Sequence, residues 1–220
     1  MDTTDRSGIS YWNEVRRKLI HLSSLWMPLA MCFLPRLWLC IAFGIMFLLN
    51  LLVEHAYASG VPWLMRLYDR FFGGMLRHNP QPGQWVISGG PYVFASACLS
   101  LALFPGKIAA CCMAVMLLGD TAAALIGRRF GRHKTVNGKS WEGVIAFLAA
   151  GYTGCALFLL ISGMPSVFYF WGAVSVFPAA AVELFEKQLH IDDNFSIPVV
   201  TGLVLSVPLF FNCHLRLMQE

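Results

Sequence analysis

Long apolar stretches, each near the length of a helix that crosses a membrane, dominate this chain of 220 residues. A helix needs about 20 apolar residues to cross the hydrocarbon layer, and continuous rather than alternating apolarity favours helices over a β-barrel. Only 13% of the residues are charged, against about 25% in soluble domains. We therefore expect an all-α, polytopic transmembrane bundle of about seven spans, forming one integral-membrane domain over residues 1–220. The predicted spans lie at about 19–35, 37–53, 86–104, 108–126, 143–162, 167–184 and 198–213.

The distribution of basic residues predicts the orientation of this bundle. With the N-terminus in the cytoplasm, all of the 16 Lys and Arg residues except Arg36, Lys107 and Arg216 fall on the cytoplasmic side. The positive-inside rule describes this bias, so the net charge of +4 requires no nucleic-acid partner. The segments outside the spans are a cytoplasmic N-terminal segment at 1–18, an interfacial loop at 54–85 and a cytoplasmic basic loop at 127–142.

A carboxylate followed by a basic, glycine-interrupted loop marks the stretch GDTAAALIGRRFGRHKTVNGKSWEG at 119–143. Asp120 lies near the end of an apolar run, where a charge is costly and by default indicates a functional site. Arg binds phosphate through paired hydrogen bonds, Lys acts as a point charge and glycines expose N–H groups, so the loop could bind a polyphosphate. The alternative is an ordinary basic loop that follows the topology rule. The residues concerned are Gly127, Arg128, Gly131, Lys134, Gly138, Lys139, Ser140 and Glu142, the last also a residue that a helix dipole favours.

An acidic cluster in AVELFEKQLHIDDNFSIPVV is predicted to lie on the same side as the basic loop. Its members are Glu183, Glu186, Asp192, Asp193 and Asn194. Carboxylates that face a polyphosphate site suggest Mg²⁺, which proteins bind through one or two carboxylates together with phosphate oxygens. Helix capping or turn formation before the next span is the alternative for the last three residues.

A third polar cluster, in NEVRRKLIHLSS, precedes the first apolar run and continues into it. Glu14, Arg17, Lys18 and His21 are three or four residues apart, which places them on one face of a helix. They could form a site, or they could anchor the helix at the membrane interface by extending their polar ends towards water.

These three clusters resemble the motifs of the CTP-dependent lipid-alcohol kinases, a family that includes dolichol kinase, phytol kinase and the yeast-type diacylglycerol kinase. The first block reads E-x-x-R-K-x-x-H, and the second reads GD-x-A-A-x-x-x-G-R-x-x-G-x-x-K followed by G-K-S-x-E-G. The third reads E-x-x-x-x-x-x-x-I-D-D-N-x-x-I-P. The blocks occur in the family's order over nearly the whole chain. The central block is shared with CDP-diacylglycerol synthases, whereas the closing block is similar to the kinases and nothing resembles the synthases' PGHGG segment and following carboxylate cluster.

The resemblance implies transfer of the γ-phosphate of CTP to the hydroxyl of a lipid alcohol, with Mg²⁺ as cofactor and CDP as product. It implies catalytic roles for Asp120, His21, Lys139 and Glu142. The implied nucleotide-binding residues are Arg17, Lys18, Gly127, Arg128, Gly131, Lys134, Gly138, Ser140 and Asn194. The implied metal ligands are Asp120, Asp192, Asp193 and Glu183.

Two other functions remain open. A phosphatidate cytidylyltransferase would attack the α-phosphorus of the same nucleotide and release pyrophosphate. A transporter or non-catalytic scaffold would instead use the intramembrane Asp and His to line a path, although we find no inverted repeat of the kind that transporters show. We expect membrane lipids, CTP and a lipid alcohol as partners, and an active site on the cytoplasmic side of a prokaryotic inner membrane. The oligomeric state is open, although the Gly- and Ala-rich spans could pack between protomers of a homo-oligomer.

Overall fold

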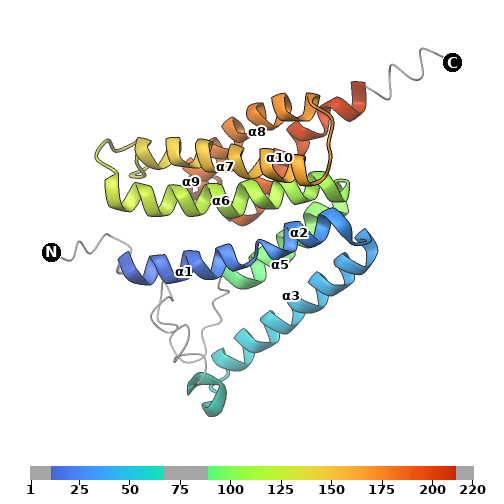
Figure 1. The fold of residues 1–220 in the computed structure, drawn as a ribbon. Coiled ribbons are helices and arrows are strands. Elements are labelled where there is room, and N and C mark those ends of the chain that lie inside the picture. The colour runs from blue at the N-terminus through green and yellow to red at the C-terminus, as the bar shows by residue number, and fades with distance from the viewer. Residues whose placement is uncertain (1–10, 67–88, 212–220) are drawn as a thin grey trace.

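A computed structural model of the protein describes residues 11–66 and 89–211 (Figure 1). The described part is helical and contains no strand, apart from one isolated bridge between Lys134 and Ser140. This confirms the predicted all-α helical bundle. The helices are α1 (Tyr11–Ser23), α2 (Trp26–Phe33), α3 (Arg36–Ala58), α5 (Gly89–Leu103), α6 (Gly106–Phe130), α7 (Trp141–Ile161), α8 (Val167–Leu184), α9 (Glu186–Leu189) and α10 (Asp193–Leu205).

Within residues 11–66 and 89–211, five helices are long and apolar enough to cross a membrane: α3, α6, α7, α8 and α10 with its continuation to Phe211. Two of the seven predicted spans are not among them. The run at 19–35 is divided, because α1 ends at Ser23 and α2 begins only at Trp26. In the run at 86–104, the described residues form α5, an apolar helix of 15 residues, and positions 86–88 lie outside the description. The total number of spans and the cytoplasmic N-terminus remain predictions.

Helix α6 lies at the centre of the bundle. Of its most apolar window, 78% is buried, and it packs against α7, α10, α2, α1 and α5. Small residues permit this close packing, as is common between helices in membranes. A Cβ atom on Gly119 would lie 3.0 Å from the Phe147 ring, and one on Gly154 would lie 3.3 Å from the carbonyl oxygen of Ala114. The residues at one end of α6 are consequently held by helices on several sides.

Helix α3 has the opposite environment. Only 17% of its apolar window is buried, and it packs mainly against α5 (Figure 1). Leu37, Trp38 and Leu52 are each more than 60% exposed. Such a surface is expected where lipid covers a helix. The interfacial helix predicted within 54–85, including Leu67 and Arg70, lies mostly outside the described residues.

The connection from α6 to α7 is a short turn that lies against the end of α8. Gly138 has a φ of +79°, a backbone conformation that residues with a Cβ atom rarely adopt. The backbone N–H of Trp141 donates to the backbone carbonyl of His133 at 2.9 Å. The Asn137 side chain donates to the carbonyl of Leu184 at 3.1 Å. The basic loop therefore has a defined position beside the acidic segment between α8 and α10.

Candidate functional site

Helix α1 places its charged side, rather than its apolar side, against the bundle. Glu14 and Lys18 are 1% and 2% exposed, whereas Trp12 and Leu19 are 71% and 59% exposed. The four-residue spacing of Glu14 and Lys18 puts both on the face that contacts α6. This arrangement suits a helix whose outer side meets lipid and whose inner side carries polar groups.

Lys18 and Asp120 form a buried ion pair that joins the first and second sequence motifs. The Lys18 ammonium donates a short hydrogen bond to Asp120 Oδ2. His21 Nε2 lies 3.5 Å from the same oxygen atom. Asp120 is only 6% exposed. Since removing one partner of a buried pair leaves an uncompensated charge, this contact strongly constrains how α1 docks on α6.

His21 contributes a buried ring nitrogen to this contact. Its Nε2 has no hydrogen-bond partner within the described residues. Helix α1 is not among the five helices that can cross a membrane. Burial, opposed by the charge of Asp120 and assisted by that of Lys18, lowers the pKa of His21 to about 4. The imidazole is therefore neutral at pH 7, and its Nε2 can accept a hydrogen bond.

Glu14 connects the N-terminal helix to the last turn of α6. It accepts hydrogen bonds from Arg17 Nη2 at 2.5 Å and from Arg17 Nε at 3.2 Å. Arg128 Nη2 lies 3.7 Å from Glu14 Oε2, the oxygen that also accepts from Arg17 Nε. Burial acts to raise the pKa of Glu14, but the hydrogen bond and charge of Arg17, with Lys18 and Arg128, lower it overall. Glu14 is thus ionised and orients two guanidinium groups.

Lys139 connects the second and third motifs. Its ammonium donates to the backbone carbonyl of Glu183 and, at 2.6 Å, to Glu183 Oε1. Glu186 Oε2 lies 3.6 Å away. Burial acts to lower the pKa of Lys139, but the charges of Glu183 and Glu186 and the hydrogen bond to Glu183 raise it overall. Lys139 is therefore a fixed cation between the basic loop and the acidic segment.

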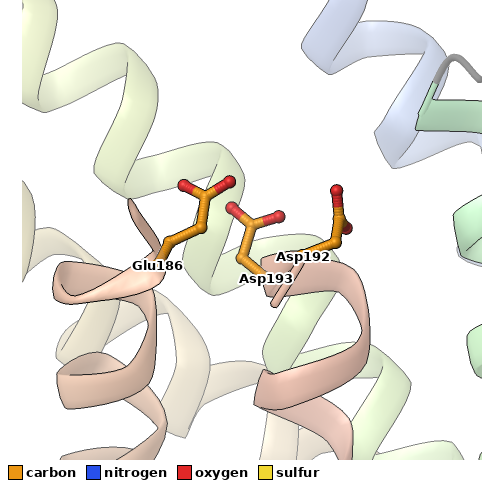
Figure 2. A group of neighbouring side chains, drawn as sticks. All are labelled: Glu186, Asp192 and Asp193. Atoms are coloured by element: carbon orange, nitrogen blue, oxygen red, sulfur yellow. The ribbon is translucent and has the colours of Figure 1, made fainter. Parts of the chain in front are cut away.

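The acidic segment brings three carboxylates together between α8 and α10. One oxygen each from Glu186, Asp192 and Asp193 lies within 4.8 Å of the others (Figure 2). Asp192 also caps α10, accepting the backbone N–H of Asn194 at 3.0 Å. The alternative of helix capping is thus confirmed for Asp192. The same hydrogen bond fixes the position of the Asp192 side chain within the cluster.

Asp193 lies close enough to affect the pKa of residues in the other two motifs. Although burial disfavours the charged forms of Arg17 and Lys139, nearby carboxylates, Asp193 among them, raise the pKa of both side chains. Three motifs that are distant in sequence therefore form one electrostatic unit at one end of α6. Its acidic members are Glu14, Asp120, Glu183, Glu186, Asp192 and Asp193, and its basic members are Arg17, Lys18, Arg128 and Lys139.

The glycines of the central motif have a packing role in this structure. A Cβ atom on Gly131 would lie 2.1 Å from the Gly127 carbonyl oxygen and 2.6 Å from Ser140 Oγ. One on Gly127 would lie 3.1 Å from that same hydroxyl. Ser140 in turn caps α7 by accepting the N–H of Gly143 at 3.2 Å. These residues bring the loop against the end of α6, which is a different reason for glycine than contact with phosphate.

Three residues predicted for the site lie apart from the contacts around Asp120. Glu142 accepts hydrogen bonds from the backbone N–H of His133 at 3.2 Å and contacts its Nδ1 at 2.7 Å. Lys134 is exposed, and its side chain forms no hydrogen bond or ion pair within the described residues. Gly138 occupies the turn between these segments. Their predicted roles stay predictions.

Glu186 belongs to the carboxylate cluster but was not assigned a role from the sequence. It follows Glu183 by three residues, so a continuous helix would have placed both on one face. Instead α8 ends at Leu184, and the short helix α9 redirects Glu186 towards the start of α10 (Figure 2). Its proximity to Asp192 in the sequence was the available signal, but two residues six positions apart are not by that spacing alone predicted to be in contact.

Comparisons with known proteins indicate distant relationships. An uncharacterised protein of Rickettsia prowazekii is 28% identical over 197 residues, or 84% of this chain and 90% of that protein. The CTP-dependent diacylglycerol kinase 1 of Schizosaccharomyces pombe is 29% identical over 66% of this chain and 69% of its own length. The phytol kinase of Synechocystis is 30% identical over 58% of this chain and 54% of its own. The chain has distant relatives among lipid kinases. No family model matches it, and no solved structure does.

Proposed function

We propose that this protein is a membrane kinase that transfers the γ-phosphate of CTP to the hydroxyl of a lipid alcohol in the presence of Mg²⁺. The observation that carries the proposal is the meeting of three sequence motifs, with paired acidic and basic groups, at one end of α6. The named activities of the distant relatives support a lipid kinase, and the CTP dependence named for the diacylglycerol kinase supports the choice of nucleotide.

The basic residues fit the binding of a triphosphate. Phosphoryl transfer depends chiefly on positioning and on neutralising charge, with little covalent chemistry for the protein to perform. Arg17 and Arg128 are both oriented by Glu14, and a guanidinium held in this way can form paired hydrogen bonds with phosphate oxygens. Lys18 and Lys139 supply point charges on either side, each already held by a carboxylate.

The carboxylates fit Mg²⁺ in their chemistry. This ion prefers oxygen ligands and is usually held by one or two carboxylates together with phosphate oxygens. Asp120, Glu183, Asp192 and Asp193 were predicted as ligands, and they lie at the same end of the bundle as the basic groups. When bound there, the ion would neutralise charge that develops on the transferred phosphate. Asp120 would in addition orient Lys18 and His21.

His21 suits a role at the lipid hydroxyl. Its neutral, buried Nε2 can accept a hydrogen bond from an alcohol that lies beside Asp120 and so orient the hydroxyl. The apolar outer surfaces of α1 and α3 would be in contact with lipid, so an alcohol could approach along the membrane with its hydroxyl at this polar end. The active site would then face the cytoplasm of a prokaryotic inner membrane, and the identity of the alcohol would depend on the apolar surroundings.

The test is to incubate detergent-purified protein with Mg²⁺, CTP and a panel of lipid alcohols, diacylglycerol and phosphatidic acid. CTP labelled at the γ-phosphate and CTP labelled at the α-phosphate are used in parallel. We expect CDP and a γ-labelled lipid, with the consumed lipid identifying the substrate. Pyrophosphate with an α-labelled lipid would establish the cytidylyltransferase alternative, and no turnover of CTP with any lipid would refute both enzymes.

A further inference from the structure

We propose that Glu186, Asp192 and Asp193, together with the Asn194 amide oxygen, bind the divalent cation, whereas Glu183 is a positioning residue for Lys139. This inference rests on the proposed function for the identity of the ion. It differs from the expectation drawn from the motifs, which included Glu183 and left out Glu186.

The separation of the carboxylate oxygens is suited to a shared cation. The three oxygens lie within 4.8 Å of one another. Opposite ligands are about 4.2 Å apart around Mg²⁺ and about 4.8 Å apart around Ca²⁺, as twice the metal–oxygen distance requires. Three ligands of an octahedral ion include at least two adjacent pairs, about 3.0 Å apart around Mg²⁺. Binding of Mg²⁺ would therefore draw the three oxygens closer together, which the side chain of Glu186 allows by rotation of its own bonds (Figure 2).

A buried amide at the same place lacks a partner. Asn194 is 9% exposed, and its Oδ1 has no hydrogen-bond partner within the described residues. Its Nδ2 lies 2.6 Å from Asp192 Oδ1 and 3.4 Å from Asp193 Oδ1, so the planar amide borders the cluster. A buried polar atom without a partner is costly. Rotation of the amide by half a turn would direct its oxygen towards a cation held by these aspartates.

The distribution of cationic side chains separates the two aspartates of this cluster from Asp120 and Glu183. Asp120 is paired with Lys18, and Glu183 is paired with Lys139. Within the described residues, no Lys or Arg forms an ion pair with Asp192 or Asp193. Adjacent carboxylates that lack such partners repel one another, and a divalent cation removes that repulsion.

Glu183 has a different set of contacts. Lys139 donates to both its backbone carbonyl and its Oε1, so the side chain is committed to holding the basic loop. Glu186 also neighbours Lys139, at 3.6 Å, but it is Glu186 whose oxygen lies beside Asp193 in the cluster. The cation and the Lys139 ammonium would thus be held side by side, which would place two positive charges along one polyphosphate.

The experiment measures binding of Mn²⁺, a spectroscopic substitute for Mg²⁺, to the full chain in detergent without nucleotide, by electron paramagnetic resonance. We expect Glu186→Gln and Asp193→Asn each to raise the Kd for Mn²⁺ by at least about tenfold, a loss of at least about 1.4 kcal/mol. Glu183→Gln should change the Kd by less than about threefold and weaken CTP binding instead, because Lys139 loses its anchor.

Glu54→Gln serves as the matched control, since this carboxylate belongs to α3 and lies outside the cluster. We expect its Mn²⁺ affinity to equal that of the unmodified protein. Size-exclusion profiles and thermal unfolding verify that each variant folds. If Glu186→Gln or Asp193→Asn does not fold, Asp192→Asn is measured in its place.

Three results would overturn the inference: no Mn²⁺ binding by the unmodified protein, an unchanged Kd in Glu186→Gln, or equal losses in Glu183→Gln and Glu186→Gln. Binding is measured without substrate, so its outcome is independent of the kinase assay. A protein that binds Mn²⁺ through Glu186 but forms no CDP would retain this site and lose the proposed function. If the protein forms CDP but Glu186→Gln leaves Mn²⁺ binding unchanged, the proposed function is retained and this cation site is refuted.

Discussion

Charged side chains have different kinds of partner at the two ends of the helical bundle. At the end of α6 that contains Asp120, buried or partly buried cations pair with buried carboxylates from segments far apart in sequence. At the opposite end, Arg36 donates to the carbonyl of Ala102 at 2.7 Å, and Lys107 donates to the carbonyl of Ser162 at 2.7 Å. Single cations there cover the open carbonyls of helix C-terminal ends, as capping and the helix dipole favour.

This difference distinguishes a structural use of charge from a functional one. A cation on a terminal carbonyl needs no buried partner and costs little. A buried ion pair must offset the desolvation of both groups, and well-packed apolar residues often stabilise a fold equally well. Retention of several such pairs in one place, within a chain that is only 13% charged, therefore argues that the charges serve a ligand.

The largest expected effect is on catalysis at the first end. Asp120→Asn should lower the rate of CDP formation by about a thousandfold, equivalent to about 4 kcal/mol of barrier, because Asp120 orients both Lys18 and His21. The measurement is steady-state turnover at a temperature at which the variant is folded, as shown by size-exclusion chromatography. Full activity would remove Asp120 from the site.

A double-mutant cycle separates stability from function at the same pair. Lys18→Met should destabilise the protein by about 3–5 kcal/mol, because Asp120 is left buried and unpaired. Adding Asp120→Asn to this variant should restore much of the lost stability and none of the turnover. Thermal unfolding and CDP formation are measured for all four members of the cycle. Recovery of activity in the double variant would show that the pair is only structural.

The stability that Glu14 contributes should depend on pH. Folding lowers its pKa from the usual 4.5, so its ion pairs stabilise the fold above that pH, and the contribution is lost as pH falls through the lowered folded pKa. The unfolding temperature of Glu14→Gln should therefore be lower than that of the unmodified protein at pH 7, and this difference should disappear below pH 4.5. Arg16→Gln, at an exposed position of the same helix, is the control. A pH-independent difference for Glu14→Gln would contradict the assignment.

The smallest effects are expected at the opposite end of the bundle. Arg36→Met and Lys107→Met remove exposed or half-buried caps, so each should cost no more than about 1 kcal/mol of stability. Turnover should change by less than about twofold. Thermal unfolding and CDP formation again provide the readouts. A tenfold loss of turnover in either variant would mean that the functional site extends through the whole bundle.

The helical class and most of the spans could be predicted from sequence because apolar length is a local property. The break between α1 and α2 could not. Nothing in the run at 19–35 specifies that the chain leaves the helix between Ser23 and Trp26. Helix ends within an apolar run depend on packing against neighbouring helices, which a linear pattern does not contain.

Within the site, the sequence by itself determined which residues are chemically capable and on which helical face several of them lie. Glu14 and Lys18 share a face because 3.6 residues make a turn. Only the tertiary structure decided the partners: Lys18 pairs with Asp120 across 102 positions, Lys139 pairs with Glu183, and Glu186 joins Asp193. Electrostatic interactions depend on distance and burial, and both arise only when the helices pack together.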